Sequence, residues 1–448
     1  MLEAEARTFV DPGAGQAERQ VPYVRVVRLA AVVMALLMIL FPVMPLVTRL
    51  LERALHLPGA VLLGVGLVKD GLLAALLVAL VWLWWQGAVR FRWRPFWVAA
   101  GFYAAWVTVY LLLAPNRLLG IYAFRGDLEP LAVLALAALL PLSREQWRRV
   151  LWVVFAVAAG VALFGLYQAL VLRIPFLHQY YANPDGTIPN AYLAYRFHFP
   201  RATSTLTTPN HLGFYLAAII LGGVNLAIRA SDRRRWAFLA VSTVCLVTLL
   251  FTLSRSAWIA LAVGLLISFV FASNKTVWVV GGTIILLALA PVAWRFHLTD
   301  RLVDTITMKD PSARSRIPSF QKGIDFVIAH PLGSGLGTVG SRTQRFGGKL
   351  QLASESYYLQ VAMEKGVPGL GLYLLLVGSA TGALFNRIRE ERDDRRRALP
   401  VAGLAALLGL SAAANFIPAL FEIPVASYMW FFAGLGLRSK RLSGDQDG

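Results

Sequence analysis

Charged residues are scarce in this 448-residue sequence, and acidic residues are the scarcest of them. Asp, Glu, Lys and Arg make up 15% of the chain, with 24 acidic residues against 43 basic ones. Soluble proteins carry about 25% charged residues. Hydrophobic residues make up 58%, which excludes an ordinary soluble fold because too much apolar surface would face water. Lipid is the solvent that tolerates such a surface.

Cysteine is nearly absent, since Cys245 is the only one and lies inside an apolar run. A disulfide framework and a Cys-based metal site are therefore excluded. His198 and His211 stand alone, and we interpret both as loop or helix-cap residues. The Gly-rich turn HPLGSGLG (330–337) lacks the Lys-Ser/Thr end of a nucleotide P-loop, which argues against ATP binding. The sequence thus predicts neither a metal site nor a cofactor.

The long apolar runs predict transmembrane helices, because they extend over about 20 residues and do not alternate as barrel strands do. The polar N-terminus does not resemble a cleavable signal peptide, so we expect the first run to be retained. Lys69 and Asp70 interrupt the second run, and they either pair with each other or mark the membrane edge. We predict spans at residues 26–48, 59–86, 96–114, 128–143, 149–172, 210–229, 236–254, 256–273, 276–295, 356–385, 400–419 and 423–437.

The predicted fold class is an all-α polytopic membrane protein with about 12 transmembrane helices and a loop subdomain of short helices on one side of the membrane. Those short helices are expected near 298–307, 315–329 and 338–346. The chain divides into a cytoplasmic tail (1–25), spans one to nine with a loop on the opposite side at 173–209 (26–295), a large loop on that same side (296–355), the last three spans (356–437) and a second cytoplasmic tail (438–448).

The short loops on one side of the predicted bundle are basic, which makes that side cytoplasmic by the positive-inside rule. They are residues 90–94, 143–149, 229–235, 273–275, 386–397 and 438–441. A net charge of +19 would suggest nucleic acid as the partner of a soluble protein. Here the rule accounts for much of the charge, and we expect no nucleic-acid partner. The long segments on the opposite side nevertheless carry arginines too.

Two arginines come just before predicted helices that begin on the side opposite the basic loops. In RATSTLTTPNHLGFYLA (201–217), Arg201 lies outside the membrane before Pro209-Asn210. A plain helix entry explains Pro209 and Asn210 equally well, and Arg201 could be a solvated loop charge. In TLSRSAW (252–258), a very short turn places Arg255 at the mouth of the bundle. Such an arginine usually faces a partner or a cavity, although a snorkelling interface residue is the alternative.

The large outer loop contributes further charged residues. Residues 312–340 combine Arg314, Arg316 and Lys322 with apolar residues spaced as in an amphipathic helix on a membrane surface. The Gly-rich turn that follows exposes backbone N–H groups that can hold anions. Glu355 precedes a long span. A carboxylate there can act as a general base, or it can simply be a helix-start glutamate favoured by the macrodipole.

These motifs share one face of the membrane, where they bring four arginines and a carboxylate together. Arginine forks match phosphate oxygens bidentately. A cationic cluster at the lipid boundary therefore predicts a lipid-linked phosphate or diphosphate as the substrate.

The order of the motifs resembles the O-antigen ligase and polymerase superfamily. The matching residues are Arg201 with Pro209-Asn210, then Thr252-Leu253-Ser254-Arg255, then Arg316, Phe320 and His330-Pro331-Leu332-Gly333, then Glu355-Ser356-Tyr357-Tyr358-Leu359-Gln360 with Glu364-Lys365-Gly366. The resemblance covers roughly residues 60–435, and its sharpest motifs lie in 201–371.

The resemblance implies a metal-independent, GT-C-like glycosyltransferase of the bacterial inner membrane. Such enzymes take a glycan from undecaprenyl diphosphate at the periplasmic face. By analogy, Arg201 and Arg255 would bind the diphosphate, and Glu355 would be the base. Further contacts to diphosphate or glycan are expected from Arg314, Arg316, Asn210 and Tyr358. Other polysaccharide-assembly proteins are possible partners.

One departure from the superfamily pattern bears on the acceptor. Ligases, which pass the glycan to lipid A-core, typically carry His where this chain has Glu355. The change slightly favours a polymerase, which passes the glycan to another lipid-linked repeat unit. Two other classes remain open. A transporter of lipid-linked oligosaccharide should show charges near the bilayer midplane, where Lys69-Asp70 is the exception among mostly uncharged spans. A non-catalytic scaffold would leave the outer arginines unexplained.

Overall fold

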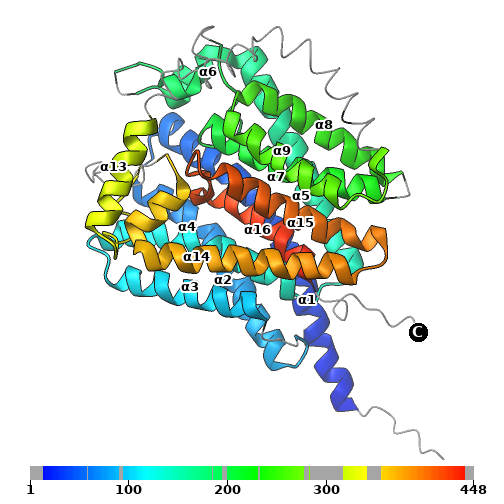
Figure 1. Cartoon of the computed structure of the whole chain (residues 1–448). Helices are drawn as coiled ribbons and strands as arrows, with labels where there is room; N and C mark the ends of the chain where they lie inside the picture. Colours follow the sequence, from blue (N-terminus) through cyan, green and yellow to red (C-terminus); the bar gives the residue numbers. More distant parts are fainter. Residues whose placement is uncertain are drawn as a thin grey trace, which may run out of the picture.

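The computed structural model describes residues 14–57, 59–89, 94–183, 185–193, 199–230, 233–276, 282, 316–340 and 355–438. Within these ranges the chain is a bundle of α-helices (Figure 1), and its only β-feature is an isolated bridge between Leu193 and Pro200. The helices are α1 (Ala14–Ala54), α2 (Gly59–Trp85), α3 (Pro95–Leu112), α4 (Arg117–Leu139), α5 (Arg144–Tyr167), the π-helix η1 (Gln168–Leu172), α6 (Arg173–Tyr181), η2 (Asn190–Tyr192), α7 (Pro209–Arg229), α8 (Arg234–Thr252), α9 (Arg255–Val270), α13 (Arg316–Ala329), α14 (Tyr357–Glu390), α15 (Asp394–Ala413), η4 (Ala419–Phe421) and α16 (Ile423–Leu437).

The chain is a polytopic all-α membrane protein, as its sequence predicts. Eleven of the twelve predicted spans coincide with a described helix, and the span at 276–295 lies almost wholly outside the described residues. By length and composition, 8 helical segments among the described residues can cross a membrane, and α9 and α16 are shorter apolar helices.

Three predicted boundaries are corrected by the structure. The span predicted at 128–143 is α4, which begins at Arg117, because the charges of Arg125 and Asp127 are hidden in ion pairs described below. The span predicted from 400 is α15, which begins at Asp394 behind the capping residue Asp393. Residues 173–181 begin the predicted outer loop, yet they form α6 and continue α5 through η1.

The centre of the bundle is formed by α7, α15 and α16, whose side chains are mostly buried. Close approach requires small residues there: a Cβ on Gly409 of α15 would meet the backbone oxygen of Ala260 in α9 at 2.5 Å. The surrounding helices turn large apolar side chains outward, for example Leu29 (63% exposed), Val78 (68%) and Leu112 (77%). A lateral surface with exposed apolar side chains is suited to contact lipid.

The bundle has two distinct ends. We call the outer end the one where α7, α9, α14 and α16 begin, and the inner end the one where α5, α8 and α15 begin. At the outer end, Arg53 at the end of α1 donates to the carbonyl of Ala182, just beyond α6, at 2.9 Å. At the inner end, Arg229 of α7 donates to the carbonyl of Phe271 after α9, at 3.0 Å. The predicted active-site residues lie at the outer end.

Candidate active site

The segment that carries Arg201 is fixed by a buried glutamine in η1. The side-chain oxygen of Gln168 accepts hydrogen bonds from the backbone N–H of Thr203 at 2.9 Å and of Ser204 at 2.8 Å. The N–H of Ala202 donates to the carbonyl of Phe251 at 2.9 Å. The segment is therefore buried rather than solvated, and the backbone at Arg201 has a defined position. Nothing in the sequence pattern singled out Gln168, a lone amide in an apolar run.

The Arg201 guanidinium is held by three segments of the chain. Its Nε donates to the Thr252 carbonyl and its Nη1 to the Ala191 carbonyl, both at 2.8 Å. Its Nη2 donates to Oδ1 of Asn210 at 3.1 Å. Contacts on three nitrogens fix the plane of the group. The interpretation of Arg201 as a freely solvated loop charge is therefore wrong.

The beginning of α7 follows the ordinary pattern of a helix start only in part. Thr208, not Asn210, is the N-cap, and its hydroxyl accepts from the N–H of His211 at 3.2 Å. Pro209 occupies the first turn, where its missing N–H has no cost. The side chain of Asn210 is thereby available to orient Arg201, so the predicted pair is brought together by direct contact.

Arg255 begins α9 directly after the α8–α9 turn. Leu253 adopts a left-handed conformation there, with φ 50°. Since Arg201 donates to Thr252 in the same turn, the structure brings Arg201 and the turn that carries Arg255 to one place. Arg255 is half-buried at this mouth of the bundle, as its sequence position predicts.

A pair of opposite charges lies at the beginning of α14. Nε of Arg316, the first residue of α13, is 3.8 Å from Oε2 of Glu355. Both side chains keep access to solvent, with 27% and 43% exposed. Ser356 caps α14 immediately after Glu355. The sequence placed Arg316 and Glu355 on one face, and the structure places them within ion-pair distance. Arg314 lies outside the described residues.

Tyr358 packs the beginning of α14 onto α15. Its hydroxyl donates to the carbonyl of Ser411 at 2.8 Å, and the ring is half-buried. The N–H of the preceding Tyr357 bonds the carbonyl of Ala414 at 2.9 Å. These contacts give Tyr358 a positioning role, and its predicted contact with the glycan stays a prediction.

Three backbone N–H groups of the Gly-rich turn at 330–337 are bonded within the fold. The N–H of Gly333 bonds His330 at 2.8 Å, that of Ser334 bonds Met363 at 2.9 Å, and that of Gly335 bonds Glu364 at 3.0 Å. The last two acceptors are carbonyls of α14, next to a break at Gly366 with φ 74°. The turn therefore clamps a broken helix and commits these three N–H groups to bonds within the fold, and its anion binding stays a prediction.

The predicted amphipathic helix is confirmed as α13. Ile317, Ile324 and Ile328 are 47%, 45% and 73% exposed and share one stripe. The opposite side packs on α14, where a Cβ on Gly323 would meet Leu359 at 2.5 Å. Figure 1 shows α13 beside the beginning of α14. An exposed apolar stripe at this end of the bundle is suited to lie on lipid.

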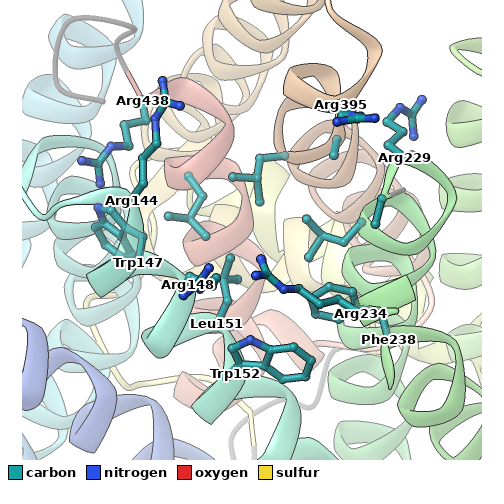
Figure 2. A pocket seen from close by; sticks show the side chains of 15 residues that line it. Arg144, Trp147, Arg148, Leu151, Trp152, Arg229, Arg234, Phe238, Arg395 and Arg438 are labelled. Atoms are coloured by element: carbon teal, nitrogen blue, oxygen red, sulfur yellow. The ribbon is translucent and has the colours of Figure 1, made fainter. Parts of the chain in front are cut away.

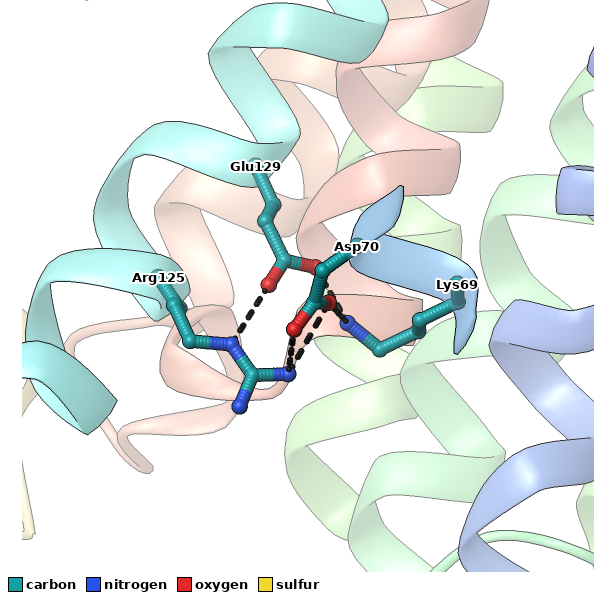
Figure 3. A network of polar contacts seen from close by, with 4 residues as sticks. All are labelled: Lys69, Asp70, Arg125 and Glu129. Atoms are coloured by element: carbon teal, nitrogen blue, oxygen red, sulfur yellow. Dashed lines mark hydrogen bonds and ion pairs between the residues drawn. The ribbon is translucent and has the colours of Figure 1, made fainter. Parts of the chain in front are cut away.

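Lys69 and Asp70 pair with each other, which confirms one of the two alternatives for this site. Lys69 Nζ is 2.7 Å from Asp70, and α2 continues through both residues. Figure 3 shows that α4 completes the network: Arg125 contacts Asp70 at 2.8 Å and Glu129 at 3.0 Å, while Glu129 also bonds Lys69. The four charges are thereby balanced inside the bundle.

A second buried pair joins α4 to α14. Nζ of Lys365 lies 2.8 and 2.7 Å from the two carboxylate oxygens of Asp127, with both side chains buried. The Tyr103 hydroxyl donates to Asp127 at 3.1 Å. The expectation that Lys69-Asp70 is the exception among uncharged spans is therefore wrong. Sequence spacing showed these charges but not their partners.

The sequence did not single out Glu422, a carboxylate beside the first turn of α7. Oε1 of Glu422, just before α16, is 3.9 Å from Nδ1 of His211, which also contacts the Thr207 hydroxyl at 2.7 Å. His211 lies in the first turn of α7, consistent with its interpretation as a cap-region histidine, while His198 lies outside the described residues. Among the described residues, no group of three or more His, Cys, Asp or Glu is placed to hold a metal ion.

Fold and site together define a multi-pass membrane protein with arginines and carboxylates gathered at one end. A family model described as O-antigen ligase matches residues 240–374. The chain is also 22% identical over 300 residues to an O-antigen polymerase of Salmonella muenchen, covering 63% of this chain and 73% of that protein. Both findings support the O-antigen ligase and polymerase superfamily, and they confirm the resemblance seen in the motifs. The region matched by the family model includes Arg255, Arg316 and Glu355, whereas Arg201 and Asn210 precede it.

Proposed function

We propose that this protein is a membrane glycosyltransferase of O-antigen or related cell-surface polysaccharide assembly. It transfers a glycan from undecaprenyl diphosphate to a sugar hydroxyl at the periplasmic face of the bacterial inner membrane. The observation that carries the proposal is the outer end itself, where the fixed Arg201 lies beside the Arg255 turn and Arg316 contacts Glu355. Superfamily likeness supports the same chemistry.

The proposed reaction is a single displacement at the anomeric carbon. The acceptor hydroxyl oxygen forms the new glycosidic bond while the bond to the diphosphate oxygen breaks. The hydroxyl proton passes to the carboxylate of Glu355, which Arg316 orients. Undecaprenyl diphosphate leaves with the bonding electrons, so its negative charge grows in the transition state. Arg201 and Arg255 offset that charge, and cations already fixed in place help most at that point.

The lipid part of the donor fits the surroundings of this site. The apolar stripe of α13 starts at Ile317, next to Arg316, and continues to Ile328. A polyprenyl chain in the membrane could therefore lie along α13 while its diphosphate reaches the arginines. The donor would approach sideways from the bilayer rather than from water.

Among acceptors, we favour another lipid-linked repeat unit slightly over lipid A-core. The support is Glu355 in place of the ligase histidine. A glycan ladder on undecaprenyl diphosphate, made by the purified protein from lipid-linked repeat units alone, would establish a polymerase. Glycan on added lipid A-core would establish a ligase. Movement of unchanged oligosaccharide across liposomes, with neither product, would contradict both and favour a transporter.

The same assay tests the site. Arg255→Ala is expected to lower turnover about 10²–10³-fold, the usual effect of removing one fixed stabilising group. Arg117→Ala is the matched control, because Arg117 is an exposed arginine at the outer end of α4. Retained turnover in Arg255→Ala would remove the diphosphate role.

A further inference from the structure

A cavity of about 440 Å³ opens at the inner end of the bundle, away from the proposed active site. It is enclosed by the inner ends of α5, α7, α8, α15 and α16. Among the described residues that line it, none is acidic, and arginines surround it (Figure 2). These arginines are Arg144, Arg148, Arg229, Arg234, Arg395 and Arg438.

The walls between the arginines are apolar and aromatic. Trp152 of α5 stacks on Phe238 of α8 with ring centroids 5.1 Å apart and planes 9° apart. Trp147 lies under the Arg438 guanidinium, whose central carbon is 5.0 Å from the ring centre. The cavity therefore combines cations with an apolar surface. This combination suits an amphiphile with a negative head, and not a free inorganic ion alone.

One of the arginines is built firmly into the wall. The Arg229 side chain is 1% exposed, and Nη1 donates to Asn225 at 2.8 Å. Two carboxylates outside the lining offset part of the charge, since Asp394 lies 3.4 Å from Arg229 and Glu145 contacts Arg148. Burial lowers the pKa of the Arg438 guanidinium to about 10. It therefore stays charged at neutral pH, where a bound anion would offset the cost of its burial.

We propose that this cavity binds an anionic phospholipid of the adjacent leaflet. The phosphate lies among the arginines, and the acyl chains leave along the aromatic wall. The positive-inside rule explains arginines in inner loops, but it does not explain arginines from five helix ends around one apolar cavity. Basic pockets between helices on the cytoplasmic side are known as a physical solution for anionic lipid heads. Arg144 and Arg438 lie on one side of the cavity and Arg229 and Arg395 on the other, so a head could be held from two sides.

The test is lipid binding by the purified full-length protein, measured by native mass spectrometry in detergent. Cardiolipin and phosphatidylglycerol are the anionic probes, and phosphatidylethanolamine is the zwitterionic one. The double variant Arg234→Gln/Arg395→Gln is expected to bind anionic lipid at least tenfold more weakly. Arg235→Gln/Arg392→Gln is the matched control, because it removes the same charge from exposed inner-end arginines outside the lining. Its affinity is expected to stay unchanged.

A second variant tests whether the empty volume of the cavity is needed, with its arginines kept. Ala230 lines the cavity, and Ala230→Trp would fill it without removing an arginine, so loss of anionic lipid is expected here too. Equal weakening in both arginine double variants would reduce the effect to general electrostatics and overturn the proposal. So would unchanged binding in Ala230→Trp, or undecaprenyl phosphate displacing cardiolipin at equal concentration. Because the readout is lipid binding, the result does not depend on glycosyl transfer at the outer end.

Discussion

At the scale of single residues, Glu355 carries the proposed proton transfer. Glu355→Gln preserves the shape of the side chain but removes its negative charge beside Arg316. We expect turnover of lipid-linked glycan to fall about 10²–10⁴-fold, the usual range for a lost general base. Glu52→Gln is the control, since Glu52 is another exposed glutamate paired with an arginine, Arg49, at 3.1 Å at the outer end of α1.

Glu422 gives this experiment an informative alternative. Glu422 lies near His211 and so at the same end of the bundle. If Glu355→Gln kept full turnover while Glu422→Gln lost it, the proton acceptor would have to be reassigned to Glu422. Equal loss in the Glu52→Gln control would instead show that any outer charge matters, which would contradict a specific role for Glu355.

The buried Asp127–Lys365 pair is predicted to matter for stability. Removing one partner leaves the other charge buried and uncompensated, which costs about 3–5 kcal/mol in comparable pairs. Asp127→Asn and Lys365→Met should each lower the melting temperature of the purified protein markedly. The double variant Asp127→Leu/Lys365→Met should recover part of the loss, because neither charge remains. A double variant that was as unstable as the two losses added together would show that the two residues act separately.

At the scale of elements, the break in α14 is the feature that sequence periodicity could not show. Gly366 has φ 74°, and a Cβ there would meet the backbone of Leu332 at 2.6 Å. Gly366→Ala should therefore destabilise the protein by about 1–3 kcal/mol through backbone strain. Gly371→Ala, further along the same helix, has open space around its Cβ and should be neutral or stabilising by roughly 0.5–1 kcal/mol. Thermal unfolding in detergent separates the two, and equal effects would argue against the clamped break.

The elements that hydropathy could predict are those whose sequence is uniformly apolar. The first half of α4 was missed because Arg125 and Asp127 look unsuited to lipid until their partners on α2 and α14 are known. Those partners are distant in sequence, and a single sequence does not reveal long-range pairing. The same limit applies to Gln168, because its structural role depends on hydrogen bonds from the backbone of Thr203 and Ser204, which are distant in sequence. By contrast, Arg201 and Arg255 could be predicted, because helix entries and short turns are local features.

At the scale of the whole molecule, the two ends of the bundle carry different kinds of positive charge. At the outer end, Arg201 is held by three hydrogen bonds, and Arg316 lies within ion-pair distance of Glu355. Inner arginines are many, and several surround the apolar cavity. The proposed chemistry requires the outer end to face the periplasm, because the lipid-linked donor is presented there. Orientation is thus the property of the whole chain on which the functional proposal depends.

Cysteine labelling can measure that orientation directly. Cys245 is buried in α8 and is the only cysteine in the chain, so a Cys245→Ser background should be silent. Glu52→Cys and Arg117→Cys introduce thiols at the outer end, whereas Gln86→Cys and Arg392→Cys introduce them at the inner end, all at exposed positions. A membrane-impermeant maleimide added to spheroplasts should label the first two, and the inner two should react only after lysis. This follows from the basic inner loops, which resist translocation. The reverse pattern would place Arg201, Arg255 and Glu355 in the cytoplasm, where a periplasmic glycan transfer could not occur.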